Sequence, residues 1–304
     1  MAGCIPKHKL SFLNRPHCGQ KTLSLLEKQK SVYNTQKDNI SYKMSSQWKF
    51  ENLDVTQRKG LLIITINRPN KKNAFSRKMY EGVTQILNDA AHNDEVSIVA
   101  FTGAGDYYSS GNDLSGYSDY EGAGTGFNAK TTDTVKNMVT AFIDFPKILV
   151  AVVNGPAIGI AVTKLGLCDV VFASEKATFR TPFTILGLSA EGCSTYTFPR
   201  IMGTSKAGSM LYFNYQMDAK EAYTCGLVSH LFKTNDLPNV LQKLEEASTL
   251  PVKSLMANKK LMRKWDQDAL HRANELESQQ LEERIASEDC VNAIIKFMQS
   301  RNKL

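Results

Sequence analysis

The sequence predicts an α/β protein whose strands are stacked by successive turns and whose last third is helical. Strand, turn and helix recur three times between residues 60 and 173, whereas the residues beyond Glu191 show the three-to-four-residue spacing of amphipathic helices. A chain of 304 residues, 42% of them hydrophobic, can bury a sizeable core. These observations favour a globular α/β fold with a helical C-terminal region.

The individual elements follow from local patterns. Strands are expected at four apolar or β-branched runs, residues 60–67, 96–102, 148–153 and 170–173. An apolar segment from Ala157 is interpreted as the start of a helix, because it follows a turn that contains glycine and proline. Further helices are expected where apolar residues recur at helical spacing, over residues 79–87, 132–142, 206–213, 219–225, 237–248 and 252–299.

Charge and composition exclude several classes of protein. The net charge of +7 lies in residues 1–50, which hold nine Lys and Arg against Glu27 and Asp38, so the remaining chain is formally neutral. A basic face for nucleic acid is therefore not expected. No uninterrupted apolar run reaches the roughly 18 residues that a membrane span needs. The six cysteines are widely spaced without a C-x-x-C pair, so neither a metal site nor a disulfide framework is expected.

Both ends of the chain carry features outside the expected domain. Residues 1–48 are interpreted as a basic leader, either a cleaved presequence or a disordered extension, because residues 1–26 contain no acid. Residues 49–304 are expected to form one domain, with a core over about 50–235 and a helical region over about 236–304. The chain closes with Asn302-Lys303-Leu304, one residue away from the Ser-Lys-Leu peroxisomal address.

Two glycine-bearing turns, residues 108–113 and 155–160, have the composition of sites that hold negative charge. Each follows an apolar strand and offers backbone N–H groups beside a glycine. A purely structural turn is the alternative for either one. Together on neighbouring strands, the turns can aim two donors at one developing oxyanion, the arrangement that stabilises an enolate.

Glu191 is the candidate general base. It is the only carboxylate between Ala177 and Asp218, and its neighbours are apolar. Burial of such a carboxyl raises its pKa and suits it to proton abstraction near neutral pH. The alternative is an ordinary acid in the first turn of a helix, with Ser189 as the N-cap.

Four motifs resemble those of the crotonase, or enoyl-CoA hydratase/isomerase, superfamily. They are N-R-P-x-K-K-N-A at residues 67–74, Y-Y-S-S-G-N-D-L at 107–114, V-N-G-P-A-I-G-I at 153–160, and T-P-F with E-G-C-S within 181–194. The chain looks most like the peroxisomal Δ3,Δ2-enoyl-CoA isomerase branch. The resemblance implies a spiral of repeated β-β-α units with a C-terminal helical region, an acyl-CoA substrate, and a homotrimer or dimer of trimers.

The resemblance also implies site residues. The oxyanion hole would be the backbone N–H groups of Ser110 and Ile160, where Gly111 and Gly159 let the chain approach the thioester. The substrate-binding set implied in this way comprises Ser109, Ser110, Gly111, Asn112, Asp113, Leu114, Gly159 and Ile160. The coenzyme A set comprises Lys72, Asn73, Ala74, Phe75 and, near the chain end, Lys296 or alternatively Arg301.

Departures from the family pattern indicate the reaction. Hydratases of the family carry two catalytic glutamates, and Thr163 and Phe183 occupy those positions here. Glu191 remains, matching the single glutamate of the isomerase branch. The expected activity is isomerisation of 3-cis- and 3-trans-enoyl-CoA to 2-trans-enoyl-CoA in β-oxidation of unsaturated fatty acids. Coenzyme A is part of the substrate, and no metal or redox cofactor is expected.

Three further expectations complete the interpretation. The alternative is a non-catalytic acyl-CoA-binding or scaffold protein, like the similar domain that is linked to chromodomains in other proteins. The single Glu191 disfavours this alternative, because a protein that only binds has no need of an acid at that position. A residual hydratase is disfavoured by Thr163 and Phe183. The isomerase branch normally ends in Ser-Lys-Leu, so the peroxisome is the expected location, with an import receptor reading Asn302-Lys303-Leu304; the basic leader makes the mitochondrion the alternative.

Overall fold

The computed structural model describes residues 48–114 and 129–301, all of them within the unit Lys43–Leu304. The basic leader, apart from residue 48, and the closing tripeptide lie outside the described residues. Among the described residues, no helix has both the length and the apolar character needed to cross a membrane.

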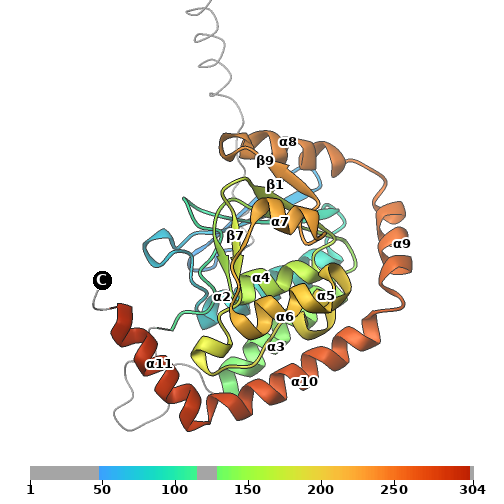
Figure 1. The fold of residues 1–304 in the computed structure, drawn as a ribbon. Coiled ribbons are helices and arrows are strands. Elements are labelled where there is room, and N and C mark those ends of the chain that lie inside the picture. Colours follow the sequence, from blue (N-terminus) through green and yellow to red (C-terminus); the bar gives the residue numbers. More distant parts are fainter. Residues whose placement is uncertain (1–47, 115–128, 302–304) are drawn as a thin grey trace, which may run out of the picture. The chain divides into compact units, whose positions relative to one another are not determined.

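The core of the fold is a six-stranded sheet with the order β1-β2-β3-β4-β6-β9 (Figure 1). Strand β1 pairs antiparallel with β2, and every later pair in this sheet is parallel. The sheet is therefore built like that of other α/β proteins, with helical crossovers between parallel strands. The strands are β1 Leu53–Arg58, β2 Leu61–Ile66, β3 Ile98–Gly103, β4 Ile148–Val153, β6 Val170–Ser174 and β9 His230–Phe232.

Both faces of this sheet are covered. Alternate residues of β2, such as Leu62 and Ile64, pack into the main core with helices α2 (Arg77–His92) and α3 (Ala129–Asp144). Their neighbours, such as Leu61 and Ile63, face the opposite side and pack with helix α8 (Leu237–Ala247). This division explains why the central strands read as continuous apolar runs, since a strand buried on both faces has no polar side.

A second, three-stranded sheet has the order β5-β7-β8. Its strands are β5 Ala157–Ile158, β7 Thr178–Arg180 and β8 Met217–Asp218, with β5 parallel and β8 antiparallel to β7. An isolated bridge between Ser109 and Ala157 ties the loop after β3 to β5, and another joins Phe75 to Asn112. These short pairings bring loops that follow different strands of the large sheet to one place.

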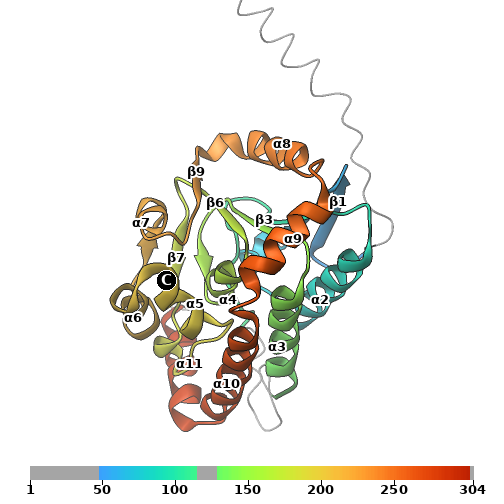
Figure 2. The same ribbon diagram turned by 90° about the vertical axis from the view of Figure 1, so that its right-hand side faces the viewer.

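The remaining helices surround this framework. Helix α10 runs beside α3 in both views, and α11 follows it (Figures 1 and 2). The short 3-10 turns are η1 Pro69–Lys71, η3 Lys164–Leu167, η4 Thr184–Leu186 and η5 Thr234–Asp236. The other helices are α4 Ile160–Thr163, α5 Ser194–Met202, α6 Thr204–Phe213, α7 Ala219–Thr224, α9 Val252–Arg263, α10 Gln267–Ile285 and α11 Glu288–Arg301.

The predicted fold class is confirmed, with one local correction. The segment from Ala157 begins as a strand rather than a helix, because Ile158 donates its N–H to the Ser109 carbonyl oxygen at 3.0 Å and pairs with Arg180. The helix starts only at Ile160, after Gly159 turns the chain with a φ of 59°. Strands β1 and β9 and helix α5 were not anticipated from the sequence.

Candidate active site

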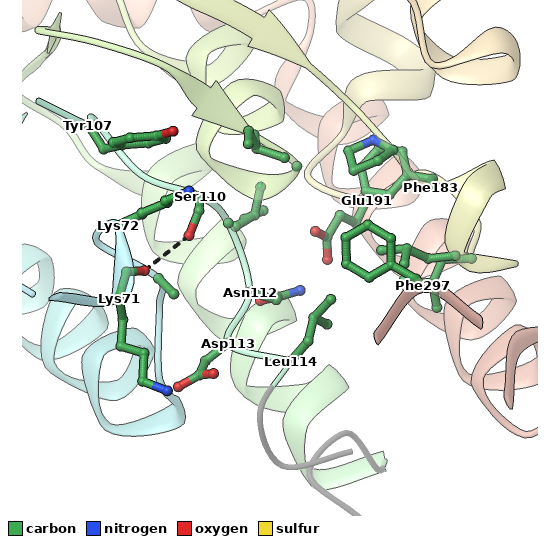
Figure 3. A pocket seen from close by; sticks show the side chains of 18 of the residues that line it. Lys71, Lys72, Tyr107, Ser110, Asn112, Asp113, Leu114, Phe183, Glu191 and Phe297 are labelled. Carbon is green, nitrogen blue, oxygen red and sulfur yellow. Dashed lines mark hydrogen bonds between the residues drawn. The ribbon is translucent and has the colours of Figure 1, made fainter. Parts of the chain in front are cut away.

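A pocket of about 640 Å³ lies where the loops after β2, β3 and β4 meet the segment that precedes α5. Figure 3 shows Glu191, Phe183 and Phe297 at one end of this pocket and Lys71, Lys72 and Tyr107 at the other. Of the predicted site residues, the pocket brings together Glu191, Lys72 and Ala74 with Ser110, Gly111, Asn112, Asp113, Leu114, Gly159 and Ile160.

The two glycine-bearing turns lie against each other in the pocket wall. Gly111 has a φ of 84°, a conformation that L side chains rarely adopt, and a Cβ there would lie 2.7 Å from the Ile158 carbonyl oxygen. The Gly111 carbonyl oxygen also accepts the Phe75 N–H at 2.8 Å. Glycine is therefore required at position 111 both for the backbone conformation and for the close approach of the second turn.

One expected oxyanion donor must be corrected. The N–H of Ser110 donates to the carbonyl oxygen of Lys72 at 2.9 Å, so it is not available to a ligand. The N–H groups of Asn112 and Ile160, in contrast, donate to no atom of the described residues, and both residues line the pocket. Ile160 is the first residue of α4, where a backbone N–H has no partner within the helix. The geometry thus offers Asn112 and Ile160 as the donor pair.

The side chain of Asn112 is also fixed in place. Tyr80, which is buried in α2, donates its hydroxyl to Asn112 Oδ1. Burial, and secondarily the charge of Glu191, raises the pKa of Tyr80, so its phenol stays protonated and able to donate. Figure 3 shows the Asn112 amide and the Glu191 carboxylate facing each other across the pocket.

Glu191 is a buried acid whose Oε2 atom has no hydrogen-bond partner within residues 48–114 and 129–301. The residue is 5% exposed, and burial raises the pKa of its carboxyl to about 8, with a further contribution from the charge of Glu277. Helix α5 begins only at Ser194, with Cys193 as the N-cap, and the Ser189 hydroxyl is buried without a partner. The interpretation of Glu191 as a first-turn acid capped by Ser189 is therefore wrong.

The two hydratase positions are occupied by groups that pack. Thr163 is fully buried beneath the Glu191 turn, and a Cβ on Gly192 would lie 2.5 Å from its Oγ1 atom. Phe183 lines the pocket and is itself 4% exposed. Glu191 is the one carboxylate among the described pocket residues apart from Asp113, whose Oδ2 lies 2.6 Å from Arg68 Nη1.

Several predicted binding residues do not line the pocket. Asn73 is fully buried, and its amide donates to the carbonyl oxygens of Ala104 and Tyr107 at 2.9 and 2.7 Å. Phe75 packs in the core with its ring centroid 5.1 Å from that of Tyr80. These two residues shape the loop from within, so the structure does not offer their side chains to a ligand.

Ser109 and Lys296 also lie outside the pocket lining. The buried Ser109 hydroxyl donates to the Asn73 carbonyl oxygen at 2.8 Å and accepts the Gly111 N–H at 3.1 Å, which braces the turn. Lys296 is exposed on α11, whereas the next residue, Phe297, lines the pocket.

Sequence reasoning did not identify part of the lining. Phe297 carries a signal that could have revealed it, because it continues the apolar face of α11 formed by Cys290 and Ile294 at helical spacing. For the loop residues no comparable periodicity exists. The pocket residues that the sequence did not single out as binding residues are Asn70, Lys71, Tyr107, Ile158, Pro182, Phe183, Leu186, Leu188 and Phe297.

Comparison with known proteins identifies the family. Residues 56–303 match the family model described as enoyl-CoA hydratase/isomerase. The chain belongs to the enoyl-CoA hydratase/isomerase family. A crystal structure of an enoyl-CoA hydratase/isomerase from Pseudoalteromonas atlantica superposes with a TM-score of 0.75 at 30% identity, covering 82% of this chain and 98% of that one. The crotonase fold expected from the motifs is therefore confirmed.

Curated members of the enoyl-CoA hydratase/isomerase family are similar over most of this chain. Enoyl-CoA delta isomerase 2 of Rattus norvegicus is 47% identical over 82% of this chain and 64% of its own length. Enoyl-CoA delta isomerase 3, peroxisomal, of Mus musculus is 44% identical over 80% of this chain and 77% of its own. The chain thus spans slightly less than two thirds of the rat relative.

Proposed function

We propose that this protein is a Δ3,Δ2-enoyl-CoA isomerase. The observation that carries the proposal is the placement of a buried carboxylate, Glu191, in the same pocket as the backbone N–H groups of Asn112 and Ile160. Among the described residues, Glu191 Oε2 has no hydrogen-bond partner and these two N–H groups have no acceptor. One base and one oxyanion hole are sufficient to move a double bond next to a thioester. The similarity to enoyl-CoA delta isomerases 2 and 3 supports this choice within the family.

The reaction consists of two proton transfers. The Glu191 carboxylate removes a proton from C2 of a 3-enoyl-CoA, and the electron pair of the C2–H bond forms the C1=C2 bond of a dienolate that keeps its C3=C4 bond. The negative charge gathers on the thioester oxygen, which accepts the N–H groups of Asn112 and Ile160. Glu191 then returns the proton to C4, which leaves 2-trans-enoyl-CoA. No electron is gained or lost, so the proposed reaction needs no redox cofactor, and the two N–H donors supply the charge stabilisation that a metal ion could otherwise provide.

The two ends of the pocket suit the two ends of this substrate. The apolar side chains of Phe183 and Phe297 lie at the Glu191 end, where an acyl chain would pack. Leu186 and Leu188 line the same pocket and pack in one apolar cluster with Phe297. Lys71 and Lys72 lie at the opposite end, where their charge suits the coenzyme A phosphates. Tyr107, whose ring is 5.2 Å from Lys72 Nζ, offers a flat face to the adenine.

The experiment is to incubate the purified protein with 3-cis- and 3-trans-enoyl-CoA and follow the conjugated 2-enoyl product by absorbance. Glu191→Gln is expected to lower kcat by about 10²–10⁴-fold, the usual contribution of a general base. Glu175→Gln, which alters an exposed carboxylate outside the pocket, is the matched control and should keep wild-type turnover. Thioester binding without turnover by the wild type would instead make the protein an acyl-CoA-binding scaffold.

We further infer a homotrimer or a dimer of trimers. Large apolar side chains are exposed on the described surface, among them Phe213 and Trp265 at 82% and Met262 at 78%. Such exposure of large apolar groups is typical of protein–protein contacts. Light scattering coupled to gel filtration measures the assembly, and a monomer at micromolar concentration would contradict the inference.

We also propose a peroxisomal location, with Asn302-Lys303-Leu304 read by the import receptor. The peroxisomal relative of Mus musculus supports this location. A fluorescent protein carrying this C-terminal tripeptide is expected to enter peroxisomes. If this fusion stays in the cytosol, the peroxisomal assignment is wrong. If the basic leader directs a fusion into mitochondria, the mitochondrion becomes the assigned location.

A further inference from the structure

Helix α5, which follows the Glu191 turn, is capped by a distant side chain. Its N-cap residue, Cys193, provides no side-chain cap. Instead, Glu277 of α10 accepts the Cys193 N–H on Oε2 at 2.7 Å and the Thr195 N–H on Oε1 at 2.8 Å. The Thr195 hydroxyl donates to the same Oε1 atom at 2.5 Å. A carboxylate at a helix N-terminus is stabilised by these free N–H groups and by the helix dipole.

Because Glu277 caps α5, the backbone N–H groups at the start of this helix are not available to Glu191. Glu191 lies two residues before the N-cap, close enough in the chain to compete for the same N–H groups. Donors of this kind stabilise an ionised carboxylate and lower its pKa. Because the buried Glu277 occupies these donors, Glu191 Oε2 has no hydrogen-bond partner in the part of the chain that the structure describes.

We propose, resting on the function proposed above, that Glu277 is a positioning residue for the base Glu191: it occupies the N-terminus of α5 and keeps the Glu191 carboxylate free and strongly basic. The charge of Glu277 acts in the same direction, because it raises the pKa of the Glu191 carboxyl. Other titratable or charged groups that act on this region are the Tyr80 phenol of α2, the Cys193 thiol, which donates to the Leu270 carbonyl oxygen at 3.4 Å, and the Arg263 guanidinium of α9.

Glu277→Gln tests this proposal through the pH profile of kcat. Glutamine keeps the size and one acceptor oxygen but removes the charge, so the rising limb governed by Glu191 should move toward lower pH by about one unit. The plateau of kcat should fall, by less than about tenfold, because a weaker base abstracts the proton more slowly. The KM should stay close to the wild-type value. A purely structural role would lower kcat without moving the midpoint.

Two control variants separate charge from packing. Thr195→Val removes one hydrogen bond to Glu277 but keeps the carboxylate, so the midpoint should stay within a few tenths of a pH unit of the wild type. Glu282→Gln removes an exposed charge from the same helix and should leave the whole profile unchanged. If Thr195→Val moves the midpoint as far as Glu277→Gln does, the proposal is overturned.

A readout independent of turnover separates this proposal from the proposed function. The pKa values of Glu191 and Glu277 are both raised above the ordinary glutamate value, so their ¹³C-carboxyl signals are expected to have raised midpoints. Only an ionised Glu277 can raise the Glu191 midpoint, so in the wild type the Glu277 signal must titrate at lower pH than the Glu191 signal. This order is measured even in an inactive protein or if Glu277→Gln fails to fold. A Glu191 signal that titrates before Glu277, or that does not move to lower pH in folded Glu277→Gln, overturns the proposal, whereas a wild type without turnover refutes only the function.

Discussion

The burial of Glu191 predicts a pH-dependent cost to stability that Glu191→Gln should remove. The folded-state pKa of this carboxyl, about 8, lies above its ordinary value of 4.5. A raised carboxyl pKa means that the folded state binds the proton more tightly than the unfolded state does. The associated stability is therefore fully present below about pH 4.5 and is lost as the pH rises through about 8.

The size of the effect follows from the pKa difference. Each pH unit of difference corresponds to about 1.4 kcal/mol, so ionised Glu191 costs the folded state on the order of 5 kcal/mol. Relative to wild type, Glu191→Gln should gain about this amount of unfolding free energy between about pH 4.5 and pH 9, because glutamine resembles the neutral acid at every pH.

Urea unfolding at matched protein concentration, measured across this pH range, gives the comparison directly. Exposed Glu175→Gln serves as the control and should follow the wild type. If the stability difference between Glu191→Gln and wild type is the same at about pH 5 and pH 9, the carboxyl is not desolvated as described.

Three further predictions concern other parts of the pocket and its support. Lys164 is 1% exposed, and its Nζ has no hydrogen-bond partner among the described residues. Burial lowers its pKa to about 8, so Lys164→Met should raise the unfolding free energy by about 3 kcal/mol at neutral pH. The wild type regains stability as the pH rises from about 8 to 10.5, because Lys164 loses its charge. In urea unfolding, the excess unfolding free energy of Lys164→Met over wild type should therefore shrink over that window, and a pH-independent excess would contradict the reasoning. Gly111→Ala should lower kcat/KM by about 10²–10³-fold because it displaces the Asn112 donor, whereas Gly105→Ala, with a similar φ of 70° but its nearest contact at 3.8 Å, should retain activity. Phe297→Ala should open the apolar end of the pocket and lower the KM for longer acyl chains relative to short ones; an unchanged chain-length profile in steady-state kinetics would remove Phe297 from the acyl site.

The sequence was sufficient for the features that depend on local pattern. Strands β2, β3, β4 and β6 were predicted because burial on both faces makes them continuous apolar runs. The two glycine turns were predicted to meet because each follows a strand of the same sheet. Gly111 and Gly159 have the positive φ angles that the motif required.

The remaining features depend on contacts between distant segments. In the loop after β3, the Lys72 carbonyl oxygen accepts the N–H of Ser110, so this N–H is not available to a ligand. No local sequence pattern predicts that hydrogen bond. The cap of α5 comes from Glu277, 84 residues beyond Cys193 in the chain. In the sequence, Glu277 is one acid in a charged helical tract and is indistinguishable from its solvated neighbours.

The contribution of the last two helices has a consequence for biosynthesis. Glu277 of α10 reaches the turn that carries Glu191, and Phe297 of α11 closes the apolar end of the pocket. During synthesis the sheet, both glycine turns and the base can leave the ribosome before either helix exists, since chains emerge from the N-terminus. A nascent or truncated chain ending before α10 would therefore carry the proposed chemical groups without the cap and the pocket wall that organise them. The chain would then become catalytically active only after helices α10 and α11 have been synthesised.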